Sequence, residues 1–147
     1  MNLSPIPSSL LEVHEFHGQG YQPLINSTAW RVSLLNFTPS LLPDQIVRFQ
    51  RHNETDEVFV LLQGRCILFL GQGVSTVTRI FAQDMIPLTL YNIKKGIWHS
   101  HALSPDAKLL IVENADTSPV NSPRLQLSLE QQEEIRELAR RLWGAYG

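Results

Sequence analysis

The sequence predicts an all-β domain, an antiparallel barrel or sandwich, with an irregular N-terminal arm and one C-terminal α-helix. Eight short runs of β-branched, aromatic and other apolar residues follow one another in the middle of the chain, and turn residues separate them. None of these runs repeats with the period of a helix. Short strands at intervals of about ten residues are typical of a closed or sandwiched β fold.

The expected strands all lie between residues 30 and 114, which we take as the barrel. In segment 1–29, Pro and Gly recur at short intervals, so we expect an arm that wraps the domain and carries at most one short strand. The strands are expected at residues 30–37, 46–50, 57–62, 65–70, 77–82, 88–91, 97–103 and 108–113.

The residues after the barrel divide into a linker and a helix. Segment 115–124 contains two Ser-Pro pairs, whereas apolar residues recur at helical spacing in segment 125–147. Ser128 and Gln131 form a capping box, and Gly144 ends the apolar pattern. We expect this helix to pack on the outside of the barrel, and the alternative is a helix that docks a partner.

The bulk composition excludes several classes of partner. A formal net charge of −2 gives no basic surface for nucleic acid, and no apolar run is long enough to span a bilayer. Cys66 is the only cysteine, so no disulfide forms within the chain, and the first residues lack the pattern of a signal peptide. We therefore expect a cytoplasmic protein with no nucleic-acid partner and no membrane partner.

The strand expected at 57–62 indicates a further contact surface. Phe59 and Leu61 occupy one face of this strand, and Val58, Val60 and Leu62 occupy the other. A strand that is apolar on both faces is covered on both sides in a folded protein. The helix, the arm or a second subunit could each provide the outer cover, and we expect a homodimer.

Two segments carry side chains of the types that bind metals. His52 and Glu57 precede and open one expected strand, and His99 and His101 share a face of another. Imidazole and carboxylate groups from the ends of two strands are a typical ligand set for a transition metal. For each histidine alone, the alternative is a hydrogen-bonded interior side chain. Because four such residues gather, we predict a metal site with these four as candidate ligands.

Three further residues are candidates for binding a small molecule. Arg48 and Gln50 share a strand face with His52, and Tyr91 precedes the segment that contains His99. A guanidinium group can hold a carboxylate or phosphate through two parallel hydrogen bonds. The alternatives are an exposed Arg48 far from the site and a Tyr91 in the core.

The segment from Gln50 to Gly64 resembles the first motif of the cupin family. That motif reads His-x-His, three or four residues, Glu, six residues, Gly. His52, Glu57 and Gly64 stand at the matching positions, and Gln50 stands where the first His would be.

The second cupin motif, Pro-x-Gly-x-x-His-x-x-x-Asn, is matched in part. Gly96 and His99 agree with it, whereas Lys94 replaces the Pro and Leu103 replaces the Asn. The resemblance covers residues 30–114. It implies a small single-domain cupin, which is an antiparallel jelly-roll barrel, also called a double-stranded β-helix, and often dimeric.

The resemblance also implies a metal, usually Fe, Mn, Ni, Zn or Cu, held at the barrel mouth by three His and one Glu. The ligands would be His52, Glu57 and His99, with Gln50 or His101 in the fourth position. The expected function is a metal-dependent oxygenase, isomerase or lyase that acts on a small polar or anionic molecule. The alternatives are a metal-free binding or sensing protein, and a metal-free isomerase or epimerase with His52 or His99 as the base.

Overall fold

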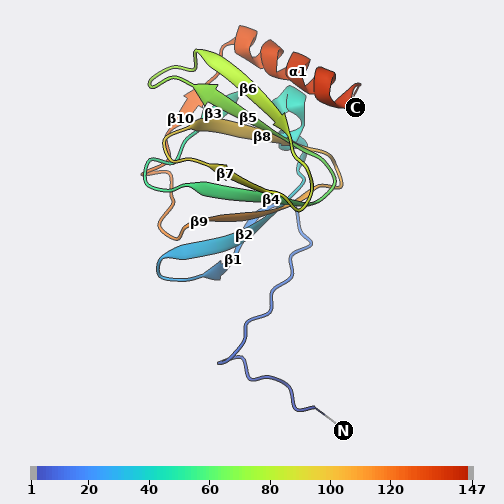
Figure 1. Cartoon of the computed structure of the whole chain (residues 1–147), viewed down its shortest axis with the longest axis vertical. Coiled ribbons are helices and arrows are strands. Elements are labelled where there is room, and N and C mark those ends of the chain that lie inside the picture. The colour runs from blue at the N-terminus through green and yellow to red at the C-terminus, as the bar shows by residue number, and fades with distance from the viewer. Residues whose placement is uncertain (1–2, 146–147) are drawn as a thin grey trace.

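The computed structural model describes residues 3–145 of the 147-residue chain. Within them, two five-stranded antiparallel sheets face each other (Figure 1). Sheet A consists, in spatial order, of β1 (Gly20–Asn26), β2 (Trp30–Asn36), β9 (Lys108–Asn114), β4 (Glu57–Gln63) and β7 (Leu90–Ile93). Sheet B consists of β10 (Arg124–Gln126), β3 (Arg48–Gln50), β8 (Trp98–Leu103), β5 (Cys66–Gln72) and β6 (Arg79–Asp84).

The antiparallel all-β barrel predicted from the sequence is confirmed. All eight expected strands are present, and their ends differ from the expected ones by at most two residues. Strand β3 begins later than expected because the 3-10 turn Pro43–Gln45 ends at Ile46. Strand β10 was not predicted, since three residues are too few to show an alternation, and its pairing with β3 defines it.

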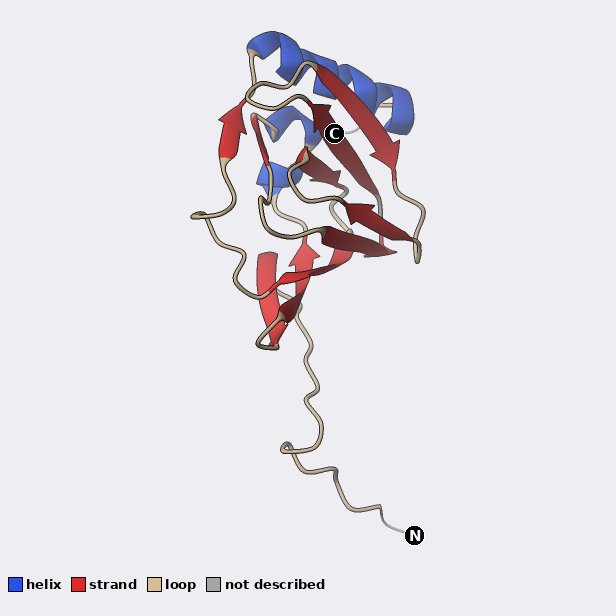
Figure 2. Cartoon of the chain, turned by 60° about the vertical axis from the view of Figure 1, so that its left-hand side comes forward, coloured by secondary structure: helices blue, strands red, loops and turns tan. Residues whose placement is uncertain are grey.

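Strand β1 forms within segment 1–29 and pairs with β2 along its whole length. Before β1 the chain leaves the body of the protein, as both Figure 1 and Figure 2 show, so the expectation that the arm wraps the domain is wrong for residues 3–15. Residues 1–2 of the expected arm and residues 146–147 of the expected C-terminal segment lie outside the described residues.

The C-terminal helix α1 (Leu129–Trp143) packs on the outer face of sheet B (Figure 2). Ser128 and Gln131 form the expected capping box, and Gly144 caps the C-terminal end with a φ of 73°, which favours glycine. The fully buried Ile135 and Ala139 belong to the apolar cluster between this helix and sheet B. Nowhere in residues 3–145 does a helix have the length and apolar character needed to cross a membrane.

A second apolar cluster fills the space between the two sheets. Its fully buried members include Phe59 and Leu61 of β4, Leu109 of β9 and Leu103 of β8. These side chains come from alternate positions of their strands, as expected for residues that point into a barrel. The outer positions of the same sheet A strands are also apolar, but α1 lies on the other sheet and does not cover them.

The interior of the barrel is apolar at one end and polar at the other. On β4, Glu57 precedes Phe59 and Leu61 on the inward face, and on β9, Glu113 follows Leu109 and Ile111 on the same face. The pairing of β4 with β9 brings the polar ends of the two strands together. The candidate functional side chains therefore gather at this end of the barrel.

Candidate metal centre

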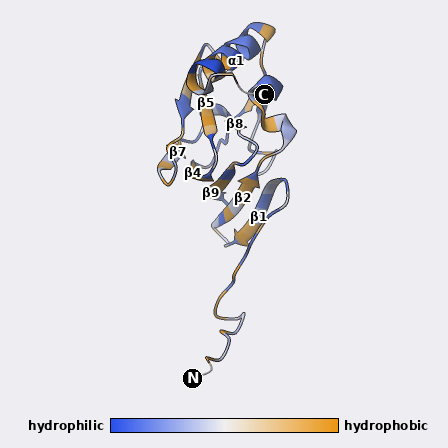
Figure 3. Cartoon of the chain, turned by 90° about the vertical axis from the view of Figure 1, so that its right-hand side faces the viewer, coloured by the Kyte–Doolittle hydropathy of each residue, from blue (hydrophilic) through white to orange (hydrophobic). Residues whose placement is uncertain are grey.

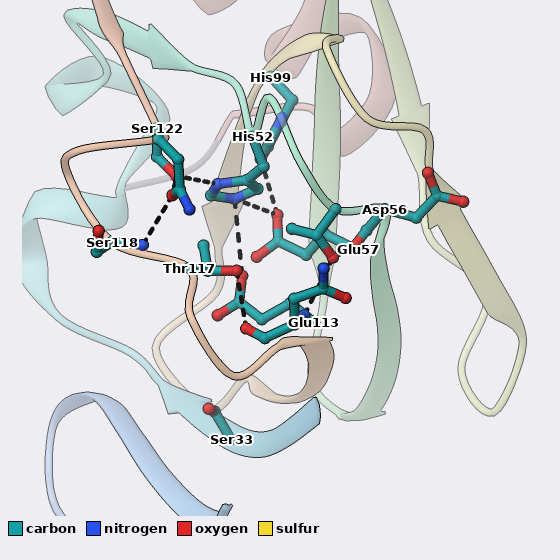
Figure 4. A network of polar contacts seen from close by, with 12 residues as sticks. Ser33, His52, Asp56, Glu57, His99, Glu113, Thr117, Ser118 and Ser122 are labelled. Atoms are coloured by element: carbon teal, nitrogen blue, oxygen red, sulfur yellow. Dashed lines mark hydrogen bonds and ion pairs between the residues drawn. The ribbon is translucent and has the colours of Figure 1, made fainter. Parts of the chain in front are cut away.

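Three of the four predicted metal ligands converge at the polar end of the barrel. His52 lies in the loop after β3, Glu57 opens β4, and His99 lies near the start of β8. One ligand atom from each residue lies within 4.8 Å of the other two (Figure 4). All three residues are buried, and none is more than 6% exposed. The two sequence motifs thus meet in space.

Glu57 occupies the middle of this cluster. Its Oε2 lies 3.0 Å from Nε2 of His52 and 2.9 Å from Nε2 of His99. The contact with His52 is a hydrogen bond, whereas the contact with His99 lacks hydrogen-bond geometry and leaves that buried Nε2 without a hydrogen-bond partner. Both imidazole nitrogens therefore face the same carboxylate oxygen.

The other ring nitrogen of each histidine fixes this orientation. Nδ1 of His99 lies 2.9 Å from the carbonyl oxygen of Ile97, which only accepts, so we assign the proton of the neutral ring to Nδ1. Nδ1 of His52 lies 2.7 Å from the hydroxyl of Ser122, which donates to Asn121 and so accepts from His52. When both rings are neutral, these tautomers direct a lone pair of each Nε2 toward Glu57, and the hydrogen bond from His52 to Glu57 forms only when the His52 ring is protonated.

Lone pairs of two imidazoles that face a carboxylate oxygen at about 3 Å repel one another unless a cation lies between them. The orphaned Nε2 of His99 and the buried Oε2 of Glu57 therefore fit a metal ion. Second hydrogen bonds from ligand histidines to fixed acceptors are the usual support of such ions. The described residues 3–145 contain no other group of this kind.

The electrostatics of the cluster also favour a positive charge. Burial opposes the ionised form of Glu57, but the hydrogen bond from His52 and the close contacts with both imidazoles outweigh burial and lower the pKa of this carboxyl. Burial opposes the charged form of His52 as well, yet the bond to Glu57 and the charge of Glu113 raise its pKa. The two carboxylates thus favour a positive charge at this position, which either a proton on His52 or a metal ion supplies.

His101 lies next to the centre but is not one of the three converging groups. Its ring packs on Phe59 with the ring centroids 5.5 Å apart, and its buried Nδ1 has no hydrogen-bond partner. Burial lowers the pKa of His101 to about 4, with Glu57 opposing this shift and His99 adding to it. Its role as a fourth ligand stays a prediction.

A cavity of about 430 Å³ adjoins the metal centre. One wall comes from sheet A, a second from Gln50 and His101 of sheet B, and a third from the loop between β9 and β10. A smaller cavity of about 170 Å³ lies beside it and shares Gln50, His101 and Arg124 with it. The centre therefore has open space next to it, which a ligand can enter.

Of the three residues predicted to bind a small molecule, two line these cavities and one does not. Gln50 lines both cavities, and Arg48 lines the smaller one together with His99. Tyr91 packs against the core cluster between the sheets, and its hydroxyl accepts a hydrogen bond from the backbone N–H of Ile86. Tyr91 is not among the residues that line either cavity, so its part in ligand binding stays a prediction.

The sequence reasoning missed most of the residues that line the larger cavity, among them Tyr21, Arg31, Glu113 and Ser122. Glu113 accepts hydrogen bonds from the first two and is itself buried. Its position on the inward face after Leu109 and Ile111 was a usable signal, because it predicts a buried carboxylate. No pattern in the sequence marks the other three.

The barrel resembles known proteins in structure but not in sequence. No family model and no curated protein matches the sequence. Among solved structures, BH2720 from Bacillus halodurans superposes with a TM-score of 0.52, at 15% identity, over 69% of this chain and 74% of that chain. A variant of Streptomyces Pac13 with uridine superposes with a TM-score of 0.53, at 7% identity, over 80% and 87% of the two chains.

Pac13 is described as a nucleoside dehydratase with a β-barrel structure. A cupin-2 domain protein from Shewanella frigidimarina is 18% identical but superposes less well, with a TM-score of 0.46 over 73% of this chain and 87% of that chain. The antiparallel architecture and the superpositions on BH2720 and Pac13 define a single barrel of the cupin fold. Its polar mouth contains a buried cluster of two histidines and one glutamate.

Proposed function

We propose that this chain binds a divalent transition metal through His52, Glu57 and His99, and that the adjoining cavity binds a small polar or anionic molecule. The contact between Nε2 of His99 and Oε2 of Glu57 carries the proposal. These buried atoms lie 2.9 Å apart without a hydrogen bond, and a bound cation accounts for that geometry.

The donor set narrows the metal to a few ions. Two imidazoles and one carboxylate suit Fe, Mn, Ni, Zn or Cu and match the ligands of non-haem Fe(II) oxygenases and of some catalytic zinc sites. When bound, such an ion supplies a Lewis acid with open positions for a ligand. An oxygenase, isomerase or lyase activity is the enzymatic form of this proposal.

Two arginines support an anionic ligand. Arg124 pairs with Gln50 in the β10–β3 ladder, and Arg48 lies two residues from Gln50 on the same face. Both line the smaller cavity beside His99, and no ion pair within residues 3–145 engages either guanidinium. A carboxylate or phosphate that enters beside the metal centre would meet both groups.

Metal reconstitution tests the proposal directly. The purified protein is treated with chelator, incubated in turn with Fe(II), Mn(II), Ni(II), Zn(II) and Cu(II), desalted and measured for metal content. We expect one equivalent of at least one metal per chain, and its loss in both His52→Ala and His99→Ala. The matched control is His17→Ala, which removes an exposed histidine of the arm.

A wild-type protein that retains none of these metals contradicts the proposal. That outcome favours the second candidate, a metal-free binding or sensing protein that uses the same cavity. One observation supports this alternative: the hydrogen bond of 3.0 Å between Nε2 of His52 and Oε2 of Glu57 forms without a metal when His52 is protonated. The same outcome is also compatible with a metal-free isomerase or epimerase in which one of the two histidines is the base.

We further propose a homodimer that forms through the outer face of sheet A. Cross-strand pairs place apolar side chains side by side on this face, and no element within residues 3–145 packs over them. The two rows are Val32, Val112 and Val58, and Leu34, Leu110, Val60 and Leu90. Figure 3 shows apolar residues in orange along β1, β2 and β9. A largely apolar sheet face fits a second copy of itself.

The size of this face agrees with a dimer. Five strands about 4.8 Å apart and about 20 Å long present roughly 500 Å². The exposed apolar residues of the arm, including Leu10 and Val13, can extend this area toward the ~800 Å² per partner of a stable interface.

Sedimentation should give a dimer for the wild type and for Val120→Lys in an exposed loop, and a folded monomer for Leu110→Lys. A monomeric wild type contradicts the dimer.

A cytoplasmic location stays a prediction that rests on the lone, fully buried Cys66.

A further inference from the structure

Glu113 is a second buried carboxylate beside the metal centre, with its side chain only 3% exposed. Its Oε1 accepts three hydrogen bonds, one of 2.7 Å from the hydroxyl of Tyr21 and two of 2.8 and 3.1 Å from the guanidinium of Arg31. The hydroxyl of Ser33 donates to the Tyr21 oxygen at 2.7 Å, which commits the Tyr21 proton to Glu113. One oxygen of this carboxylate is therefore held from three directions.

The other oxygen of Glu113, Oε2, has no hydrogen-bond partner among the described residues although it is buried. Nε2 of His52 lies 3.8 Å from it, which is too far for a hydrogen bond. In Figure 4, Glu113 lies beneath His52 and Glu57. A buried acceptor without a partner is costly, so an unpaired oxygen that faces a cavity indicates a missing donor.

Glu113 does not belong to the metal ligands themselves. The atoms that lie within 4.8 Å of one another come from His52, Glu57 and His99, and Glu113 is not part of that group. It does line the 430 Å³ cavity together with His52 and Glu57. Its free oxygen is therefore placed to meet a ligand that sits next to the metal, rather than the metal.

We infer that Oε2 of Glu113 accepts a hydrogen bond from a hydroxyl group of the cavity's ligand, so that the site selects small hydroxylated anions over analogues without the hydroxyl. This inference rests on the proposed metal centre and deepens it. Arg124 lines the same cavity as Glu113, and its guanidinium group can bind the anionic end of such a molecule. A site built to hydrogen-bond a hydroxyl discriminates strongly against analogues that lack it, because its own polar group is then left unpaired.

The substitution Glu113→Gln replaces the free hydrogen-bond acceptor with a donor and keeps the shape of the side chain. Tyr21 and Arg31 donate three hydrogen bonds to the Oε1 position, so the amide oxygen of glutamine must occupy it. The amide NH₂ group then takes the place of Oε2 and faces the cavity. An acceptor for the ligand becomes a donor, while the hydrogen bonds that hold the side chain remain.

The test compares two probes that differ by one hydroxyl group, glycolate and acetate. Each is titrated into the Co(II)-loaded protein, and binding is followed by the visible absorption of the cobalt ion. The measured quantity is the ratio of the two affinities, because the lost charge of Glu113 affects both anions alike and cancels. The control Glu134→Gln removes an exposed carboxylate of α1.

We expect the preference for glycolate over acetate to fall at least about tenfold in Glu113→Gln and to stay unchanged in Glu134→Gln. The inference is overturned if the wild type and Glu113→Gln show an equal preference, or if the cobalt-loaded wild type binds neither probe. Neither result contradicts the proposed metal centre. A wild type that takes up no cobalt removes the metal centre and the inference together.

If Glu113→Gln does not fold, a crystal structure of the wild-type cobalt complex with glycolate decides the matter. A glycolate hydroxyl within hydrogen-bond distance of Oε2 of Glu113 supports the inference, and a hydroxyl directed elsewhere overturns it.

Discussion

Gln50 lies directly opposite His99 in the pairing of β3 with β8. Residues opposite each other in an antiparallel ladder share a face and have Cα atoms about 5 Å apart. The side chain at position 50 therefore starts next to a candidate ligand, and it lines both cavities. In the cupin motif this position is a histidine.

Replacement of Gln50 by histidine should strengthen metal binding. An imidazole is a better ligand than a carboxamide for late transition metals, and the position already faces the centre. We expect Gln50→His to raise the affinity at least about tenfold, which corresponds to ~1.4 kcal/mol. Competition with a chromophoric chelator measures this change. An affinity equal to that of the wild type would show that the side chain at position 50 does not reach the metal.

Ser122 should support the metal centre from the loop between β9 and β10. Its hydroxyl holds Nδ1 of His52 at 2.7 Å and so directs Nε2 toward Glu57. Loss of such an outer partner commonly lowers metal affinity by about 10- to 100-fold, and we expect this range for Ser122→Ala. Ser40→Ala, on an exposed turn, is the control and should bind as the wild type does. Unchanged binding by both variants would contradict the assigned role of Ser122.

The metal-free protein should lose stability as the pH falls from about 6.5 to 4. His101 binds a proton in the unfolded chain near 6.5, whereas burial lowers its pKa in the folded protein to about 4. The unfolded state holds more protons across this window, so the free energy of unfolding decreases by about 3 kcal/mol on acidification.

Urea denaturation at several pH values checks this expectation. His101→Leu removes the titrating group, so its stability should depend less on pH across that window than the stability of the wild type. His17→Leu, an exposed site on the arm, should leave the dependence unchanged. Identical pH profiles for the wild type and His101→Leu would mean that His101 is not held neutral in the fold.

The C-terminal helix should contribute to the stability of sheet B through Ile135. This side chain is fully buried in the apolar cluster beneath α1, whereas Leu129 of the same helix is 81% exposed. We expect Ile135→Ala to lower the free energy of unfolding by about 2–5 kcal/mol. Leu129→Ala should change it by no more than about 0.5 kcal/mol. Equal effects in urea denaturation would indicate that α1 does not pack stably on the barrel.

The fold was predictable because local signals determine most of it. Short apolar runs bounded by turn residues define most of the strands, and the capping box at Ser128 and Gln131 defines where α1 begins. Strand β10 escaped prediction because only its pairing with β3 makes it a strand. The side of the barrel that α1 covers is likewise set by packing, since both sheets have apolar outer faces.

The candidate site was predictable only where short-range spacing carries the information. His52 and Glu57 are five residues apart, and His99 was found through a second motif. Tyr21 lies 92 residues from Glu113 in sequence, and Ser122 lies 70 residues from His52, so their contacts follow from the closure of the barrel. Spacing in one sequence contains no information about such pairs.

The most direct measurement is anomalous X-ray diffraction from crystals of the metal-reconstituted protein, with data above and below the absorption edge of the bound metal. We expect one strong anomalous peak within bonding distance of Nε2 of His52, Oε2 of Glu57 and Nε2 of His99. A crystal with no peak among these three side chains, or with the metal bound elsewhere on the chain, would contradict this expectation.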